Sequence, residues 1–125
     1  MVIHSSKFLI FTDCGSQIGF GHLNRCNSIK TELERKNVEV LMEVYDDRNG
    51  TNVKLDWKNE WLAFIDAHQV THVLVDSFRV NERFFQDLIK LKKNVFVIDD
   101  FPERDHKGGT VINWTEGAEA DSFLP

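Results

Sequence analysis

Short runs of apolar residues alternate along this chain with longer segments in which apolar residues recur at helical spacing. The short runs predict five strands, at residues 7–12, 38–44, 73–75, 95–98 and 111–112. The longer segments predict three helices, at residues 22–36, at residues 57–68 and in a segment capped by Asn81. Continuous apolar runs are typical of strands that are buried on both faces. The alternation therefore predicts an α/β fold, a Rossmann-like parallel sheet with helices on both faces.

The first predicted helix has a well-defined apolar face. Leu23, Cys26, Ile29 and Leu33 recur on it at helical spacing, and Asn37 follows as a plausible stop. Because Cys26 belongs to this face, we interpret it as a small core residue and not as a nucleophile.

The turn between the first strand and the first helix contains three glycines and ends in a histidine. It reads Asp13-Cys14-Gly15-Ser16-Gln17-Ile18-Gly19-Phe20-Gly21-His22. Glycines let backbone N–H groups approach a ligand closely, and a helix N-terminus attracts anions. His22 can move a proton near neutral pH. The turn therefore predicts a site for a phosphate or another oxyanion, although a glycine turn that serves packing alone gives the same pattern.

Aspartates follow three of the predicted strands. The first strand ends at Thr12-Asp13, the third at Asp76-Ser77-Phe78 and the fourth at Asp99-Asp100. Ligands of parallel α/β sheets bind beyond the carboxyl ends of the strands, so we expect these side chains beside the glycine turn. Aspartates at strand ends also cap turns and helices, which is the alternative interpretation. A metal is not predicted, because the acids lie on separate loops without a matching ligand spacing.

Length, charge and cysteine content limit the class of protein. The 125 residues suit a single domain, and the net charge of −5 gives no reason to expect nucleic acid as a partner. No apolar run is long enough to span a bilayer, and residues 1–6 lack the features of a signal peptide. Two cysteines do not form a disulfide framework. We therefore expect a cytoplasmic protein, and we interpret the acidic stretch at Asp46-Asp47 as a solvated loop.

The run from Ser16 to His22, followed by Arg25, closely resembles the opening motif of the nucleotide-sugar hydrolases of the pseudaminic-acid pathway. The same family includes spore-coat polysaccharide proteins that are similar to glycosyltransferases. Supporting similarities are Val73-Leu74-Val75-Asp76, Val97-Ile98-Asp99-Asp100 and Val111-Ile112-Asn113. These motifs occur in the family's order from about Phe8 to Phe123.

The resemblance implies the first half of a GT-B type enzyme. Members of the family have two Rossmann-like domains, of which the first contains the glycine turn and the second binds UDP. They hydrolyse a UDP-linked trideoxy diacetamido sugar at the anomeric carbon and release UDP, without a metal or another cofactor. We therefore expect residues 1–125 to form the first domain alone, without the nucleotide-binding C-terminal domain.

The same resemblance, combined with the chemistry of the side chains, predicts the site residues. His22 is expected to act as general base, and Asp13 is the best candidate for orienting its imidazole. The backbone N–H groups from Gly19 to Gly21 are expected to meet the oxygens of the departing diphosphate. The residues expected to bind substrate are Gln17, Gly19, Phe20, Gly21, Arg25, Asp76, Phe78 and Asp99. Some relatives have a His-Tyr pair where this chain has Ser77-Phe78, so the identity of the sugar is left open.

Two other classes of function remain open at this point. A GT-B glycosyltransferase domain has a similar turn, but its histidine faces an acceptor hydroxyl instead of water. A non-enzymatic α/β interaction domain is the third possibility, for example one that resembles a receiver domain. Receiver domains pair two acids near the first strand and place a lysine after the fifth strand, whereas this chain has Asn113-Trp114-Thr115 after the fifth.

Overall fold

The computed structural model describes residues 6–49, 55–99 and 107–112, and its strands and helices alternate along the chain. The strands are β1 (Lys7–Cys14), β2 (Glu39–Asp46), β3 (His72–Asp76), β4 (Asn94–Ile98) and β5 (Thr110–Ile112). The α-helices are α1 (Gly21–Arg35), α2 (Trp61–His68) and α3 (Glu82–Ile89). Two short 3-10 helices, η1 (Asp47–Asn49) and η3 (Trp57–Asn59), lie between β2 and α2.

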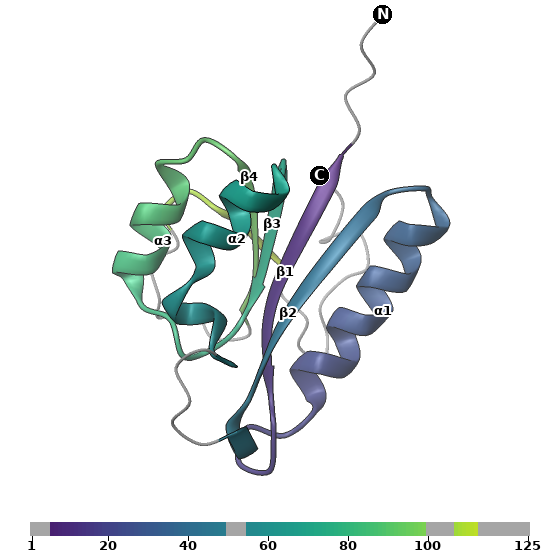
Figure 1. Cartoon of the computed structure of the whole chain (residues 1–125), viewed down its shortest axis with the longest axis vertical. Coiled ribbons are helices and arrows are strands. Elements are labelled where there is room, and N and C mark those ends of the chain that lie inside the picture. The colour runs from purple at the N-terminus through teal and green to yellow at the C-terminus, as the bar shows by residue number, and fades with distance from the viewer. Residues whose placement is uncertain (1–5, 50–54, 100–106, 113–125) are drawn as a thin grey trace, which may run out of the picture.

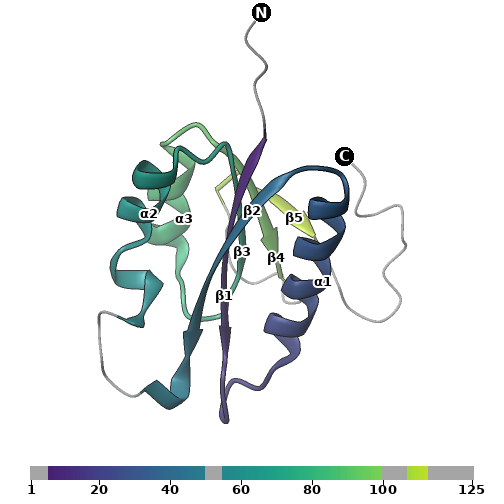
Figure 2. The ribbon, with the colours of Figure 1, turned by 45° about the vertical axis from the view of Figure 1, so that its right-hand side comes forward.

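All five strands pair in parallel and form one sheet in the order β2-β1-β3-β4-β5. Helix α1 covers one face of the sheet, and α2 and α3 lie together on the other face (Figures 1 and 2). This arrangement confirms the predicted α/β fold with a parallel, Rossmann-like sheet. Helix α1 begins at Gly21, so the prediction that His22 lies at the start of the first helix is also confirmed.

Successive residues of β1 point to opposite layers of the molecule. Leu9 and Phe11 belong to the hydrophobic core on the side of α2 and α3, whereas Ile10 packs with Cys26 of α1. In β3, Leu74 lies on the α1 side. Because of this alternation, only acidic side chains on the α1 side of the sheet can reach the first turn of α1.

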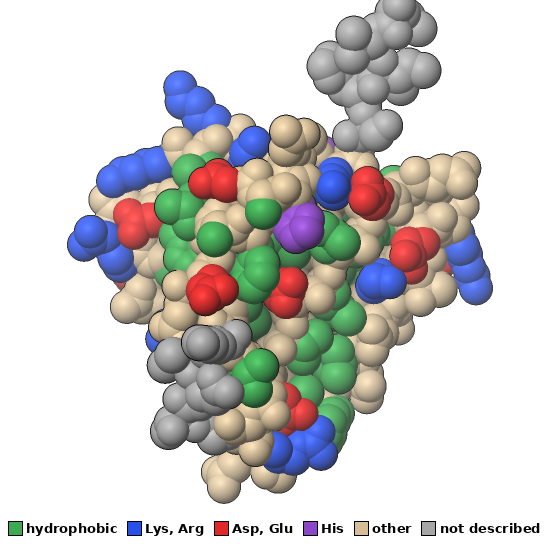
Figure 3. All heavy atoms as spheres, in the orientation of Figure 1, with side chains coloured by type: hydrophobic (Ala, Val, Ile, Leu, Met, Phe, Trp, Pro, Cys, Tyr) green, Lys and Arg blue, Asp and Glu red, His purple; other side chains and the backbone are tan. Residues whose placement is uncertain are grey.

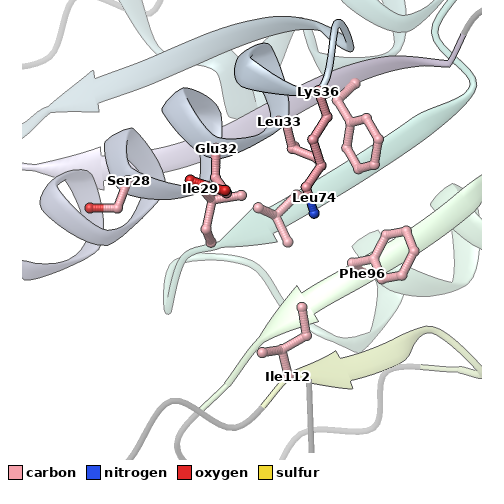
Figure 4. A pocket seen from close by; sticks show the side chains of 9 residues that line it. Ser28, Ile29, Glu32, Leu33, Lys36, Leu74, Phe96 and Ile112 are labelled. Atoms are coloured by element: carbon pink, nitrogen blue, oxygen red, sulfur yellow. The ribbon is translucent and has the colours of Figure 1, made fainter. Parts of the chain in front are cut away.

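The sheet face under α1 is only partly covered by that helix. Leu74, Phe96 and Ile112 of the sheet, together with Ile29 and Leu33 of α1, line a groove of about 570 Å³ (Figure 4). No residue that lines this groove belongs to the predicted site, so the groove and the glycine turn are separate features of the molecule.

The segment predicted as one helix at residues 57–68 is divided in two. Trp57 starts η3, and Glu60, with φ −133° and ψ 17°, interrupts the helical backbone before α2 begins. The Trp57 indole N–H donates to the Thr12 carbonyl oxygen at 2.8 Å, and its ring stacks on Phe11 with 4.7 Å between centroids. These contacts tie η3 to the sheet. The second strand is also longer than predicted, because it continues to Asp46.

Charges of both signs are mixed on the described part of the surface in Figure 3. Lys and Arg side chains alternate there with Asp and Glu, and this face shows no basic stripe of the kind that tracks a nucleic-acid backbone. Among the described residues, no helix is both long enough and apolar enough to cross a membrane.

Candidate functional site

The candidate site lies where β1 and β3 end beside the first turn of α1. These two strands are neighbours, and Thr12 of β1 is in register with Asp76 of β3. The first turn of α1 places His22, Arg25 and Cys26 on one side of the helix, because residues three and four apart share a face. All three side chains have polar contacts with the Asp76 carboxylate.

Asp76 is the centre of this cluster and is fully buried. Its Oδ1 lies 2.7 Å from Nδ1 of His22, and Arg25 binds both carboxylate oxygens, at 2.6 Å from Nε and 2.6 Å from Nη2. Thr12 donates its hydroxyl to the Asp76 carbonyl oxygen at 3.1 Å. The resemblance predicted Arg25 and Asp76 as substrate-binding residues, and in this structure they bind each other.

The contacts of Asp76 determine its charge and the tautomer of His22. Burial raises the pKa of Asp76, but hydrogen bonds from Arg25 and His22 outweigh this effect and lower the pKa below its ordinary value. An ionised carboxylate only accepts hydrogen bonds, so Nδ1 of His22 carries the proton that it shares with Asp76. Arg25 Nη2 also lies 3.2 Å from Nδ1, but the 2.7 Å carboxylate contact is the shorter of the two and favours a proton on Nδ1. In the neutral ring this tautomer has its lone pair on Nε2.

Cys26 is not a nucleophile in this setting. Its side chain is fully buried and its thiol donates to Asp76 at 3.5 Å. Burial and the neighbouring Asp76 charge raise the pKa of Cys26 to about 12, so the thiolate is not formed near neutral pH. The structure thus agrees with the interpretation of Cys26 as a core residue.

One exposed phenylalanine contacts His22 and a second precedes its helix. Phe78 is 49% exposed, and the His22 and Phe78 rings meet edge to face with 4.8 Å between centroids. Phe20 is 42% exposed and immediately precedes α1. The His22 side chain itself is 11% exposed. The exposed ring of Phe78 therefore adds apolar surface directly beside the imidazole.

Asp13 does not face His22, contrary to the expectation that it orients the imidazole. It accepts a hydrogen bond from the Ser77 hydroxyl and another from Nη2 of Arg79 at 2.8 Å. The reason is the alternation along β1. Asp13 lies on the same side of β1 as Phe11, which faces α2 and α3. Thr12 lies on the same side as Ile10, which faces α1. The structure therefore replaces Asp13 by Asp76 as the partner of His22.

Arg79 organises a second polar cluster that the sequence did not reveal. Its guanidinium binds Asp13 and also Asp56, at 2.8 Å from Nη1 and 3.0 Å from Nη2, and it lies 3.7 Å from the centroid of the Tyr45 ring. Its Nε is buried and has no hydrogen-bond partner within the described chain. No local sequence motif predicts this cluster. Its members, Tyr45, Asp56 and Arg79, are separated in the sequence and meet only in the folded protein.

The glycine turn is closed by its own backbone and by Asp47. Gly15 and Gly19 form an isolated antiparallel bridge, in which Gly19 N–H donates to the Gly15 carbonyl oxygen at 2.7 Å. The Asp47 carboxylate accepts the N–H groups of Ser16, Gln17 and Ile18 at 2.9, 2.9 and 2.8 Å. The expectation that Asp46-Asp47 is a solvated loop is therefore wrong, since Asp46 ends β2 and Asp47 holds the turn.

This closure changes which N–H groups can meet an anion. The Gly19 N–H, expected to contact the substrate, is already used by Gly15. The N–H groups of Gly21 and His22, in the first turn of α1, make no hydrogen bond within the described part of the chain. Helix starts of this kind are natural anion sites.

Of the remaining predicted residues, Asp99 is described, whereas Asp100 and Asn113 are not. Asp99 directly follows β4, is buried, and its N–H donates to the Ile112 carbonyl oxygen at 3.1 Å. In the described ranges, no group of three or more His, Cys, Asp and Glu side chains is arranged to hold a metal ion.

Comparison with known proteins gives one distant relative. The chain is 28% identical over 124 residues to the uncharacterized protein MJ1062 of Methanocaldococcus jannaschii, a match that covers 90% of this chain and 26% of that protein. The chain thus spans about a quarter of the length of the curated relative that it matches. No family model matches the chain, and no solved structure gives a significant match.

Proposed function

We propose that this chain is the N-terminal domain of a GT-B type nucleotide-sugar hydrolase, in which His22 activates water for attack on an anomeric carbon. The observation that supports this most strongly is the contact of 2.7 Å between Nδ1 of His22 and the buried Asp76. It holds the imidazole at the carboxyl edge of the sheet and supports Nε2 as the proton acceptor. General bases are recognised first by such geometry.

In the proposed reaction each group of this chain has a defined task. Nε2 of His22 takes a proton as the water oxygen bonds to the anomeric carbon, and the bond from that carbon to the diphosphate oxygen breaks. Asp76 stabilises the positive charge that develops on the ring. The N–H groups of Gly21 and His22 are placed to donate to the departing diphosphate.

The helix dipole and the Asp76 carboxylate act on the His22 ring in opposite directions. The N-terminal end of a helix disfavours a nearby positive charge by about 0.3–1 kcal/mol. A hydrogen bond to a charged group contributes about 1.5–3 kcal/mol. Since the carboxylate contact is the larger effect, it decides the orientation of the ring.

The proposal includes partners that this chain does not supply by itself. The substrate is a UDP-linked trideoxy diacetamido sugar, used in nonulosonic acid or surface polysaccharide biosynthesis in the cytoplasm. The UDP moiety is held by a C-terminal GT-B domain. The reaction needs no cofactor and involves no nucleic acid.

The test is UDP release from this substrate by a two-domain protein that contains this chain. His22→Ala should slow release by about 10²–10⁴-fold, which is the usual contribution of general base catalysis. Glu34→Gln, at a surface ion pair with Lys30 on the same helix, is the matched control and should leave the rate unchanged. A His22→Ala protein as fast as the parent would contradict the proposal.

The alternative is a GT-B glycosyltransferase domain, in which Nε2 of His22 faces an acceptor hydroxyl. The same assay separates the two functions when it is run with and without an acceptor alcohol. UDP release that requires the acceptor, together with transfer of the sugar to it, would establish the transferase and overturn the hydrolase.

A further inference from the structure

The turn between β1 and α1 is held by a carboxylate that comes from the end of β2. Asp47 receives the three consecutive N–H groups of Ser16, Gln17 and Ile18, all within 2.8–2.9 Å of its oxygens. These hydrogen bonds lower the pKa of Asp47, the Ile18 N–H having the largest effect, which keeps the acceptor ionised. A carboxylate therefore fills the concave face of the turn, where such N–H groups would otherwise bind an external anion.

Gly15 is fitted to this contact. A Cβ at this position would lie 2.0 Å from Oδ1 of Asp47, and the backbone of Gly15 has φ +138°, which side-chain-bearing residues rarely adopt. The residue at 15 and the residue at 47 therefore fit each other although they are far apart in the sequence. This fit is independent of the hydrogen bonds made by the next three residues.

The residues at the end of β2 and in η1 also contact the end of the turn that leads into α1. Arg48 pairs with Asp46 at 2.6 Å, and its guanidinium lies 5.2 Å from the centroid of the Phe20 ring. Phe20 is the N-cap of α1 and provides no side-chain cap for that helix. The start of α1, and with it the position of His22, therefore depends on how the preceding turn is held.

We infer that Asp47 is a positioning residue for His22, which holds the β1–α1 turn from the end of β2 and so places the imidazole against Asp76. The catalytic consequence rests on the proposed function, whereas the positioning does not. Because Asp47 fills the turn at residues 16–18, a phosphate of the substrate should bind at the N–H groups of Gly21 and His22 and not at that turn.

The test is NMR spectroscopy of the 125-residue chain and its Asp47→Asn variant. Asparagine keeps the shape but loses the charge and one acceptor oxygen, so amide exchange at residues 16–18 should become about 10- to 100-fold faster. The imidazole ¹⁵N shifts of His22 should move from a single tautomer, protonated at Nδ1, toward a mixture of tautomers. Asp87→Asn, at a surface pair with Arg83, is the control and should change neither signal.

Gly15→Ala provides a second route to the same change, because its Cβ would displace the Asp47 carboxylate. It should accelerate exchange at residues 16–18. The part of the effect that comes from the clash should disappear when Asp47 is already alanine, whereas the part that comes from the φ of +138° should remain. Methyl signals of the core report whether each variant is folded.

Three outcomes bear on the inference separately. Faster exchange at residues 16–18 with a shifted His22 tautomer supports it. Faster exchange with unchanged His22 shifts, in a folded variant, would overturn the positioning role. Unchanged exchange would overturn the contact itself. None of these readouts depends on hydrolysis. A failure of the proposed function would be seen separately, as a lack of UDP release from the proposed substrate or as full activity of the His22→Ala protein.

Discussion

Asp76 shows how one buried charge can organise several neighbours. An ionised carboxylate that is fully buried is costly unless it is paired and fully hydrogen-bonded. Arg25 contacts both carboxylate oxygens, and His22 and the Cys26 thiol contact one oxygen each. The pairing therefore serves both the stability of the fold and the orientation of the imidazole.

Replacing Asp76 by asparagine should destabilise the protein in a pH-dependent manner. Removing one partner of a buried pair typically costs about 3–5 kcal/mol. The pKa of Asp76 is below its ordinary value of 3.8 in the folded state, so its contribution is complete above that value and is lost as pH falls through the folded pKa. Urea unfolding measures the difference in unfolding free energy between the parent and Asp76→Asn. This difference should be at its maximum at pH 6 and should decrease below about pH 3.8.

Glu34→Gln is a suitable control for this comparison as well, since it removes an exposed carboxylate. Such pairs contribute about 0–1 kcal/mol. A gap between parent and Asp76→Asn that stays constant from pH 6 to pH 3 would show that the charge of Asp76 does not stabilise the fold.

At the scale of elements, the starts of α1 and α3 differ in their capping. Asn81 caps α3 by accepting the Phe84 N–H at 3.1 Å, as predicted from the sequence. Helix α1 has no side-chain cap, although its first turn adjoins the candidate site. A side-chain cap would use the same N–H groups that an anionic ligand needs. The uncapped start of α1 is compatible with the proposed contact to a diphosphate, although α2 also starts without a side-chain cap.

Asn81→Ala should lower the free energy of unfolding by about 1 kcal/mol, the usual effect of losing an N-cap. Asn81→Ser should retain most of the stability, because serine accepts the same N–H group. Urea unfolding of both variants checks this expectation. Equal losses in the alanine and serine variants would show that the hydrogen bond to Phe84 N–H is not the stabilising contact.

At the scale of the whole molecule, the parallel sheet brings the ends of β1 and β3 to one edge and presents His22 there. Phe78, which contacts the His22 ring, and Phe20, which directly precedes α1, are both exposed. The His22 side chain keeps 11% of its surface exposed among the described residues. A second domain that binds the nucleotide would complete such a site, in keeping with the proposed GT-B arrangement.

The 125-residue chain alone should therefore release UDP far more slowly than a two-domain protein that contains it. Binding energy from remote parts of a substrate supports chemistry at the reacting centre. In the proposed arrangement the isolated chain would gain little of this binding energy, because the UDP moiety is held by the other domain. Coupled detection of UDP measures both rates. A chelator should leave the two-domain rate unchanged, whereas loss of activity that Mg²⁺ restores would contradict the proposed mechanism.

Local patterns were sufficient for the elements of this protein. The apolar runs predicted all five described strands, the glycine turn placed His22 at the start of α1, and Asn81 was recognised as a cap. These features depend on neighbours within a few residues, so periodicity and turn chemistry determine them. The sequence also implies that Asp13 and Thr12 point to opposite faces of the sheet, because they are neighbours in β1.

Only the tertiary structure decided which side chains meet. Asp76 and not Asp13 faces His22, because α1 packs on the face to which Asp76 and Thr12 belong. Arg79 joins Asp13 to Asp56, and Asp47 holds the glycine turn from 29 to 31 residues away. The physical reason is that strand order and helix side are set by the packing of the whole sheet. A local pattern can place a carboxylate at a strand end, but it does not select the partner across the sheet.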